Sequence, residues 1–284
     1  MIEEGYLVVE CYTSNAVIEF KTTIPEPVLT GISSTMPVVG SRVTITGQNF
    51  IQVVNINVNG EFDIPAADIT VSEAFDELSF ILPQAPTHSG KISLTTGGGT
   101  GELSTVFYPL ENVILDYDGI GSHSWGDNSY SVQADGTSAP FVSSGNCYGI
   151  VGTISAWNYW WGQCVDNARW PTTISGGTAV SELELQFECF VKDVLTGPVL
   201  QVVLGSNWDF NLTGYVPVNA FTGGKEAGKW MQCTIPLSSV VAESTWQEFL
   251  NRGSSEIGLY VTNPTGNENV NVAVYFDNFR IVRK

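Results

Sequence analysis

The sequence predicts an all-β protein, an immunoglobulin-like sandwich followed by a β-sandwich of the jelly-roll type. Short runs of alternating apolar and polar residues recur along the chain, and Gly, Pro and Asn separate them. Alternation of this kind is typical of strands that bury one face, and its regular punctuation by turn residues favours antiparallel sandwiches. The only stretch that indicates a helix is short, residues 244–253.

The aromatic residues divide the chain into two regions. Residues 1–109 contain no Trp, whereas residues 110–284 contain all eight. We place a domain boundary at this step in composition, where Pro109 lies. The expected domains are an immunoglobulin-like domain over 24–109 and a jelly-roll domain over 110–284.

Each domain has its own series of expected strands. In the first domain they are 42–50, 54–60, 78–83 and 91–96, and the second run ends in the turn pair Asn-Gly. In the second domain they are 147–157, 182–191, 199–206, 229–237, 255–263 and 271–282. The expected helix has Ser244 or Thr245 as its cap and ends at Gly253.

The first residues repeat the pattern that closes the immunoglobulin-like domain. Residues 5–29 and 90–115 both read Gly, a strand, a polar turn, a second strand ending in Phe, and a linker with Pro. We therefore expect residues 1–23 to be the last hairpin of a preceding immunoglobulin-like domain, in a fragment of a longer tandem array.

The charge of the chain restricts its partners. The formal net charge is −18, from 29 acidic and 11 basic side chains. Nucleic acid and anionic membrane surfaces require a basic footprint, so we expect neither as a partner. Acidic polysaccharides would also be repelled, whereas a neutral ligand would not. The sequence contains no apolar run of the roughly 18–20 residues that a membrane span needs.

The five cysteines show no CxxC pair and no zinc-type spacing. We expect them to be small buried hydrophobic residues within strands. A Cys147–Cys164 disulfide is an open alternative, and the pattern does not fix the redox compartment.

The heptapeptide AWNYWWG at 156–162 concentrates three Trp and one Tyr in five positions. In a strand, Trp157, Tyr159 and Trp161 would share one face and Trp160 would lie on the other. One core-facing side cannot bury all four rings, so we expect at least two of them to be exposed.

Other tryptophans fall into two groups. Trp125 has the loop-like flanks GSHS and GDNS, which favour binding over packing. Trp230 is expected in the core and Trp246 is expected to anchor the short helix. Trp170 could belong to either group.

Four segments carry a family resemblance. Residues 27–50, PVLTGISSTMPVVGSRVTITGQNF, resemble the start of a TIG-type immunoglobulin-like domain. Residues 229–240 and 274–282, together with LDYDG at 115–119, resemble strands of jelly-roll carbohydrate-binding modules. In this order the two domains resemble the type-B surface glycan-binding proteins of Bacteroidetes polysaccharide-utilisation systems.

The resemblance implies a function and a location. In that family, immunoglobulin-like domains space a terminal binding domain away from the outer membrane, and an N-terminal lipidated cysteine anchors the array at the cell surface. The implied ligand is a neutral plant polysaccharide, a β-glucan such as xyloglucan or mixed-linkage glucan, and mannan and laminarin remain open. The implied partners are a neighbouring outer-membrane importer and surface enzymes.

The resemblance also implies a set of binding residues. The family's aromatic platform matches Trp125, Tyr159 and Trp160, and its hydrogen-bonding amide matches Asn207. This sequence differs by two further Trp beside the expected pair, Trp157 and Trp161. Trp208, next to Asn207, completes the candidate set.

Two other classes of function stay open. A glycosidase or lyase would need a pair of placed carboxylates, and no recognisable catalytic motif contains one; Glu182, Glu184 and Glu188 are interpreted as a solvated strand surface. His123 has no recognisable partner motif. A surface adhesin that binds protein is the second alternative. We expect no catalysis and no cofactor.

Structural calcium is a weaker hypothesis. Asp116 and Asp118 lie on the first strand expected in the second domain, which begins near residues 113–119, and Asp277 lies on the last; the two strands could be adjacent. Ca²⁺ takes six to eight oxygen ligands, so three carboxylates do not complete a site. Turn and edge carboxylates are the alternative interpretation.

Overall fold

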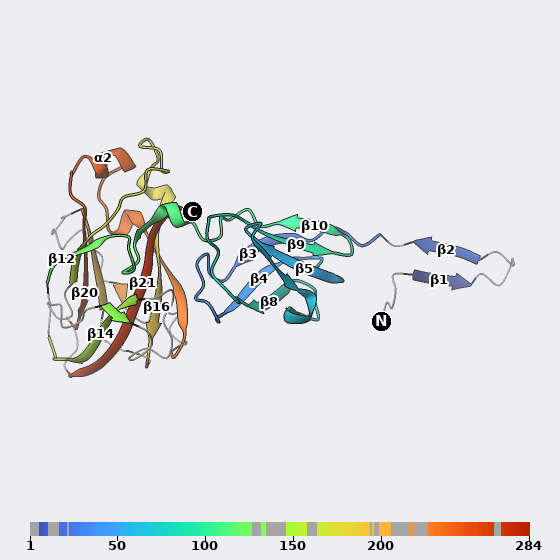
Figure 1. Cartoon of the computed structure of the whole chain (residues 1–284), viewed down its shortest axis with the longest axis horizontal. Helices are drawn as coiled ribbons and strands as arrows, with labels where there is room; N and C mark the ends of the chain where they lie inside the picture. The colour runs from blue at the N-terminus through green and yellow to red at the C-terminus, as the bar shows by residue number, and fades with distance from the viewer. Residues whose placement is uncertain are drawn as a thin grey trace. The chain divides into compact units, whose positions relative to one another are not determined.

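The structure is a computed structural model, and it confirms the all-β prediction. It describes residues 6–10, 17–21, 23–126, 132–134, 146–157, 164–193, 195, 199–205, 216–217, 227–263 and 268–284. These residues form five antiparallel sheets (Figure 1). The chain divides into two compact units. Unit 1 consists of Met1–Ser33, Arg42–Ile81 and Pro86–Phe107, and unit 2 of Ser34–Ser41, Leu82–Ala85 and Tyr108–Lys284.

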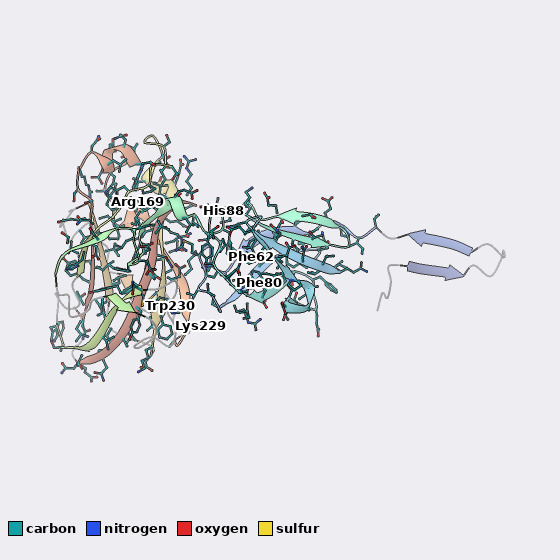
Figure 2. All side chains as sticks on the ribbon, viewed as in Figure 1. Phe62, Phe80, His88, Arg169, Lys229 and Trp230 are labelled. Atoms are coloured by element: carbon teal, nitrogen blue, oxygen red, sulfur yellow. The ribbon has the colours of Figure 1, made fainter. Side chains whose placement is uncertain are left out.

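Unit 1 contains a sandwich of two four-stranded sheets. One has the order β3-β4-β8-β7 and the other β10-β9-β5-β6. Alternate residues of their strands are fully buried, for example Val43 and Ile45 on β4 and Phe80 on β8. Phe80 is labelled in Figure 2. The strand bounds are β3 Val28–Ile32, β4 Arg42–Gln48, β5 Val53–Val58, β6 Phe62–Pro65, β7 Thr70–Val71, β8 Glu77–Ile81, β9 Ile92–Thr96 and β10 Gly99–Glu102.

The predicted Asn-Gly turn connects β5 to β6. Asn59 and Gly60 both have positive φ, 53° and 76°, which suits the twist of a tight hairpin. Strands β1 (Tyr6–Glu10) and β2 (Val17–Lys21) form a separate two-stranded sheet. The assignment of residues 1–23 to a preceding domain stays a prediction.

Unit 2 is a sandwich of two larger sheets. The β21 sheet has the order β13-β14-β21-β16-β19, with β11 also paired to β21, and the β20 sheet has the order β12-β15-β20-β17-β18. Their bounds are β11 Val113–Leu115, β12 Ser122–Gly126, β13 Val132–Ala134, β14 Asn146–Ile154, β15 Cys164–Asn167, β16 Leu183–Val191, β17 Val199–Leu204, β18 Val216–Pro217, β19 Trp230–Pro236, β20 Glu256–Thr262 and β21 Val270–Arg283.

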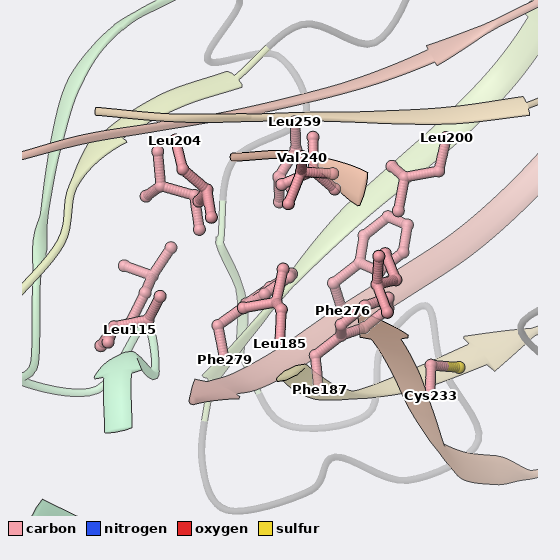
Figure 3. Close-up of a cluster of buried hydrophobic side chains, with 14 of the residues drawn as sticks. Leu115, Leu185, Phe187, Leu200, Leu204, Cys233, Val240, Leu259, Phe276 and Phe279 are labelled. Carbon is pink, nitrogen blue, oxygen red and sulfur yellow. The ribbon is translucent and has the colours of Figure 1, made fainter. Parts of the chain in front are cut away.

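The core of unit 2 lies between these two sheets. Alternate residues of β16 (Leu185, Phe187) and of β20 (Leu259) contribute to one buried cluster (Figure 3). Phe187 stacks on Phe279 of β21, with ring centroids 4.9 Å apart. The sequence periodicity therefore identified the core-facing side of these strands.

The short helix α2 (Trp246–Leu250) forms where it was expected. Thr245 caps it, and Glu248 completes a capping box by accepting hydrogen bonds from the backbone N–H groups of Ser244 and Thr245. Trp246 is fully buried, as predicted. Trp170 packs edge-on against Trp246 and Phe249. Of the two roles that the sequence left open for Trp170, the structure therefore supports packing against the core.

Part of the other face of the β21 sheet is also buried, and here one interpretation was wrong. Glu188 on β16 is 1% exposed rather than solvated. Its carboxylate accepts two hydrogen bonds from the fully buried Arg280, at 2.8 and 3.0 Å. Glu182 is exposed and Glu184 is half-buried, so the interpretation failed at the third carboxylate of the run.

Three more side chains surround this ion pair. We define the Arg280 cluster as Thr35, Gln186, Glu188, Gln232 and Arg280. The Arg280 guanidinium also donates to Gln186 Oε1 (3.2 Å), Thr35 Oγ1 (3.1 Å) and Gln232 Oε1 (2.9 Å). Thr35 belongs to the segment Ser34–Ser41, which the structure places in unit 2. A bidentate pair with further hydrogen bonds satisfies charges that burial would otherwise penalise.

The three cysteines whose side chains the structure describes are buried thiols, as expected. Cys147, Cys189 and Cys233 form no disulfide, so the Cys147–Cys164 alternative was wrong. Burial, with a smaller effect of Asp277, raises the pKa of the Cys147 thiol to about 12. Cys147 and Trp230 belong to a small apolar cluster with Val38, Phe190 and Tyr275, so Trp230 is buried as predicted (Figure 2).

Candidate functional site

Trp125 lies in a strand, not in a loop as its flanks suggested. It is part of β12, the edge strand of the β20 sheet, and its backbone pairs with that of Val165. The same row continues through Gly258 on β20 to Val203 on β17. The register is irregular between His123 and Trp125, and irregularities of this kind are common at sheet edges and next to binding sites.

Both faces of the β20 sheet are buried in its central strands. Ile257 and Leu259 point into the core between the sheets. The residues that alternate with them lie on the opposite face, where Tyr260 and Gln201 are each 1% exposed and pair across β20 and β17. The row of paired residues that runs from Trp125 through Val165 and Gly258 to Val203 therefore lies next to a part of the sheet that is buried on both faces.

The aromatic run 156–162 lies in the connection between the two sheets. Strand β14 ends at Ile154 in the β21 sheet, and β15 begins at Cys164 in the β20 sheet. Trp157 is in a turn, so the expectation that it continues a strand was wrong at this residue. Its side chain is 57% exposed, the largest exposure among the large apolar side chains of the part that the structure describes.

The remaining aromatic candidates fall where the structure gives no description. Tyr159, Trp160 and Trp161 lie outside the described residues, in the same connection as Trp157. Asn207 and Trp208 also lie outside them, shortly after β17 ends at Leu204. The composition of the platform beyond Trp125 and Trp157 stays a prediction.

The three calcium candidates have local structural roles. Asp116 Oδ1 accepts hydrogen bonds from the backbone N–H groups of Asp118, Gly119 and Ile120, at 3.0, 2.9 and 2.7 Å. Asp118 Oδ1 accepts from the N–H of Asn146, at 2.7 Å. The expected adjacency of the first and last strands is correct, because β11 pairs with β21.

Asp277 differs from the other two in being completely buried on β21. Burial raises its pKa well above the usual value, and the nearby Glu188, Asp118 and Asp116 act in the same direction. Within the described ranges, no three Asp, Glu, His or Cys side chains are arranged to hold a metal ion. The hydrogen bonds of Asp116 and Asp118 agree with the turn interpretation for these two residues, whereas Asp277 lies on a central strand.

Sequence reasoning missed two sets of polar contacts. His123 has a carboxylate partner, Asp166, whose Oδ1 is 3.2 Å from His123 Nδ1 across the β12–β15 pair. The turn at Trp157 is contacted by the amides of Asn263 and Asn269. No local pattern indicates these contacts, because the partners are between 43 and 113 residues apart.

The chain was compared with known proteins. Residues 107–283 match the family described as surface glycan-binding protein B, xyloglucan-binding domain. An IPT/TIG domain-containing protein of Bacteroides ovatus is 64% identical over 286 residues, which cover all of this chain and 58% of that protein. The chain thus spans little more than half the length of this relative.

Solved structures show the same relationship. One, determined with a xylogluco-oligosaccharide, is 62% identical with a TM-score of 0.85, and the match covers 100% of this chain and 64% of that one. Another is the surface glycan-binding protein B from a complex xyloglucan utilization locus in Bacteroides uniformis. It is 48% identical with a TM-score of 0.83, and the match covers 100% of this chain and 80% of that one.

The match of a family model to more than half of the chain, in the domain that contains Trp125 and Trp157, agrees with the resemblance drawn from the sequence. The chain belongs to the surface glycan-binding protein B family.

Proposed function

We propose that this chain binds a neutral plant β-glucan, with xyloglucan as the first candidate, and does not cleave it. The observation that carries the proposal is the similarity over all 284 residues of the sequence, at 62% identity, to a structure determined with a xylogluco-oligosaccharide. The formal charge of −18 is compatible with a neutral ligand and unfavourable for polyanions.

Stacking on aromatic rings is the proposed mechanism. The C–H face of a pyranose ring is apolar, and a flat indole or phenol ring covers it while polar groups at the edge bind the hydroxyls. We assign Trp125, Tyr159 and Trp160 to the platform and Asn207 to the hydroxyl contact. Trp157, Trp161 and Trp208 are the further candidates, and the exposure of Trp157 supports its assignment.

Capture at the cell surface is the proposed role. Single sugar contacts are weak, and several rings acting on one chain raise the affinity. We propose that the whole protein is an outer-membrane lipoprotein facing the exterior, and that it supplies glycan to a neighbouring importer and surface enzymes. Among the described residues, no helix has the length and apolar character needed to span a membrane.

Native affinity electrophoresis tests the proposal. Wild type, Trp125→Ala and Trp160→Ala would run in gels containing xyloglucan, mixed-linkage glucan, laminarin, galactomannan or starch. We expect a β-glucan, xyloglucan first, to retard the wild type, and both variants to migrate as in a gel without glycan. A wild type that no neutral glycan retards would contradict the proposal.

Phe75→Ala provides a matched control. Phe75 in unit 1 is also an exposed aromatic residue, at 45%, and also has a positive φ, at 56°. We expect it to leave the retardation unchanged. Release of reducing sugar from the same polysaccharides would identify an enzyme, and loss of retardation in Phe75→Ala would place binding in the immunoglobulin-like domain.

A further inference from the structure

Trp157 has a backbone conformation that its side chain does not favour. Its φ is 58°, in the left-handed region, where a bulky residue is an outlier and Gly, Asn or Asp is usual. Packing does not account for this conformation, because 57% of the side chain is exposed. Phe75 in unit 1 combines the same two features, so the evidence for a role of Trp157 in binding is its place in the Trp-rich run of the glycan-binding domain and the contacts that hold its turn.

Two amides hold the turn that contains Trp157. The last paired residues of β14 and β21 are Ile154 and Val270, and the turn Ser155–Trp157 follows them directly. Asn269 Oδ1 accepts a hydrogen bond from the N–H of Ala156, at 3.1 Å. Asn263 Nδ2 donates to the carbonyl of Ser155, at 3.5 Å.

The side chain of Asn263 acts as a hydrogen-bond donor within the folded domain. It is completely buried, and its Nδ2 also donates to the carbonyl of Glu268, at 3.0 Å. Its Oδ1 is buried and has no hydrogen-bond partner among the residues that the structure describes. A buried carbonyl without a partner is costly, so the donor function of this side chain is the one that the site uses.

We propose that Asn263 and Asn269 are positioning residues that fix the Ser155–Trp157 turn and so hold the Trp157 ring ready for the glycan. This inference rests on the proposed function. A ring that is already oriented loses less conformational freedom when the ligand binds, and the affinity rises accordingly.

The two amides make opposite predictions for substitution by Asp. Asn269 uses only its acceptor in this contact, and Asp at this position retains an acceptor for the Ala156 N–H. Asn263 uses only its donor, and an ionised Asp has none to offer. Asn269→Asp should therefore keep the hydrogen bond to Ala156, and with it the glycan affinity, that Asn269→Ala loses. Asn263→Asp should lose the hydrogen bond to Ser155 and the affinity in the same way as Asn263→Ala.

Asn271→Ala is the matched control. Asn271 is an exposed Asn on β21, two residues beyond Asn269, and its Oδ1 accepts a hydrogen bond of 2.7 Å from Thr153 Oγ1 on β14. This contact resembles the one made by Asn269, but it lies before the turn. Its removal should leave the turn and the glycan affinity unchanged.

A double-mutant cycle on the full chain tests the proposal. The dissociation constant for a xylogluco-oligosaccharide would be measured for wild type, Asn269→Ala, Trp157→Ala and the double variant. We expect Asn269→Ala to weaken binding about two- to tenfold in the wild-type background. In the Trp157→Ala background we expect it to have no further effect. Asn269→Asp should match the wild type within about twofold.

Hydrogen exchange provides a readout that needs no ligand. The Ala156 amide should exchange faster in Asn269→Ala and at the wild-type rate in Asn269→Asp and Asn271→Ala. A wild type that binds while Trp157→Ala binds equally well would overturn this inference and leave the proposed function intact. An equal loss of glycan affinity from Asn269→Ala in the wild-type and Trp157→Ala backgrounds would also overturn this inference. A wild type that binds no glycan would overturn both.

Discussion

Two polar networks in unit 2 each hold a segment of backbone that is distant in sequence, and they differ in burial. The Arg280 cluster binds the segment Ser34–Ser41 through Thr35, and both Arg280 and Glu188 are almost completely excluded from solvent. The amides of Asn263 and Asn269 hold the Ser155–Trp157 turn, which presents an exposed ring. The first network should therefore determine stability, and the second should determine binding.

The largest effect is expected from Arg280→Ala. This change leaves the Glu188 carboxylate buried without its ion pair, which costs about 3–5 kcal/mol and is a large part of the stability of an ordinary domain. Denaturant unfolding measures the loss. Lys91→Ala breaks an exposed pair with Glu102 and should cost at most about 1 kcal/mol. Equal losses in the two variants would contradict the comparison.

A smaller loss is expected from Thr35→Val. The change retains the shape of the side chain and removes the hydroxyl that bonds Arg280, Gln186 and Gln232. We expect a cost of about 1–3 kcal/mol for the groups left without partners, with no change in glycan affinity under conditions where the chain is folded. An altered affinity at unchanged stability would show that this network also acts on binding.

The pH dependence of stability should reveal Asp277. Its pKa is raised in the folded state, chiefly by burial and further by Glu188, Asp118 and Asp116. Its contribution to stability is therefore fully present below the unfolded pKa, near 4, and is lost as the pH rises through the folded pKa.

Asp277→Asn removes this titration and retains an acceptor for the Asn278 N–H. The variant should gain stability relative to wild type as the pH rises from about 4, measured by unfolding at a series of pH values. A stability difference that does not change with pH would contradict the assignment.

The smallest effect on stability is expected from Trp157→Asn. Asn accepts the left-handed conformation more readily than Trp, so the free energy of unfolding should stay within about 1 kcal/mol of wild type or rise. The glycan affinity should fall, because the ring is lost. Thermal unfolding and glycan titration of the same samples test this separation. A large loss of stability would show that Trp157 serves folding.

Much of the fold could be predicted because its determinants are local. The alternation in residues 182–191 and 271–282 identified β16 and β21, and a cap residue at 244 or 245 with Gly253 at the end identified α2. The partners of buried polar groups could not be predicted. Glu188 was assigned to solvent because Arg280 is 92 residues away and Thr35 is 245 residues from Arg280.

The candidate site was predictable in composition and not in conformation. The Trp-rich run identified the region, and its one described ring, that of Trp157, is exposed. Strand periodicity was the wrong template for it, because β14 ends at Ile154 and the chain turns toward the second sheet. Trp125 was assigned to a loop because its Gly and Ser neighbours are weak strand formers, and pairing with β15 overrides that preference.

The most direct test of the account is an isothermal calorimetric titration of a xylogluco-oligosaccharide into wild type and Trp160→Ala, with the thermal unfolding of both proteins recorded. We predict saturable binding by the wild type, no detectable binding by the variant, and equal unfolding temperatures. A folded Trp160→Ala variant that binds as tightly as the wild type would contradict the aromatic platform.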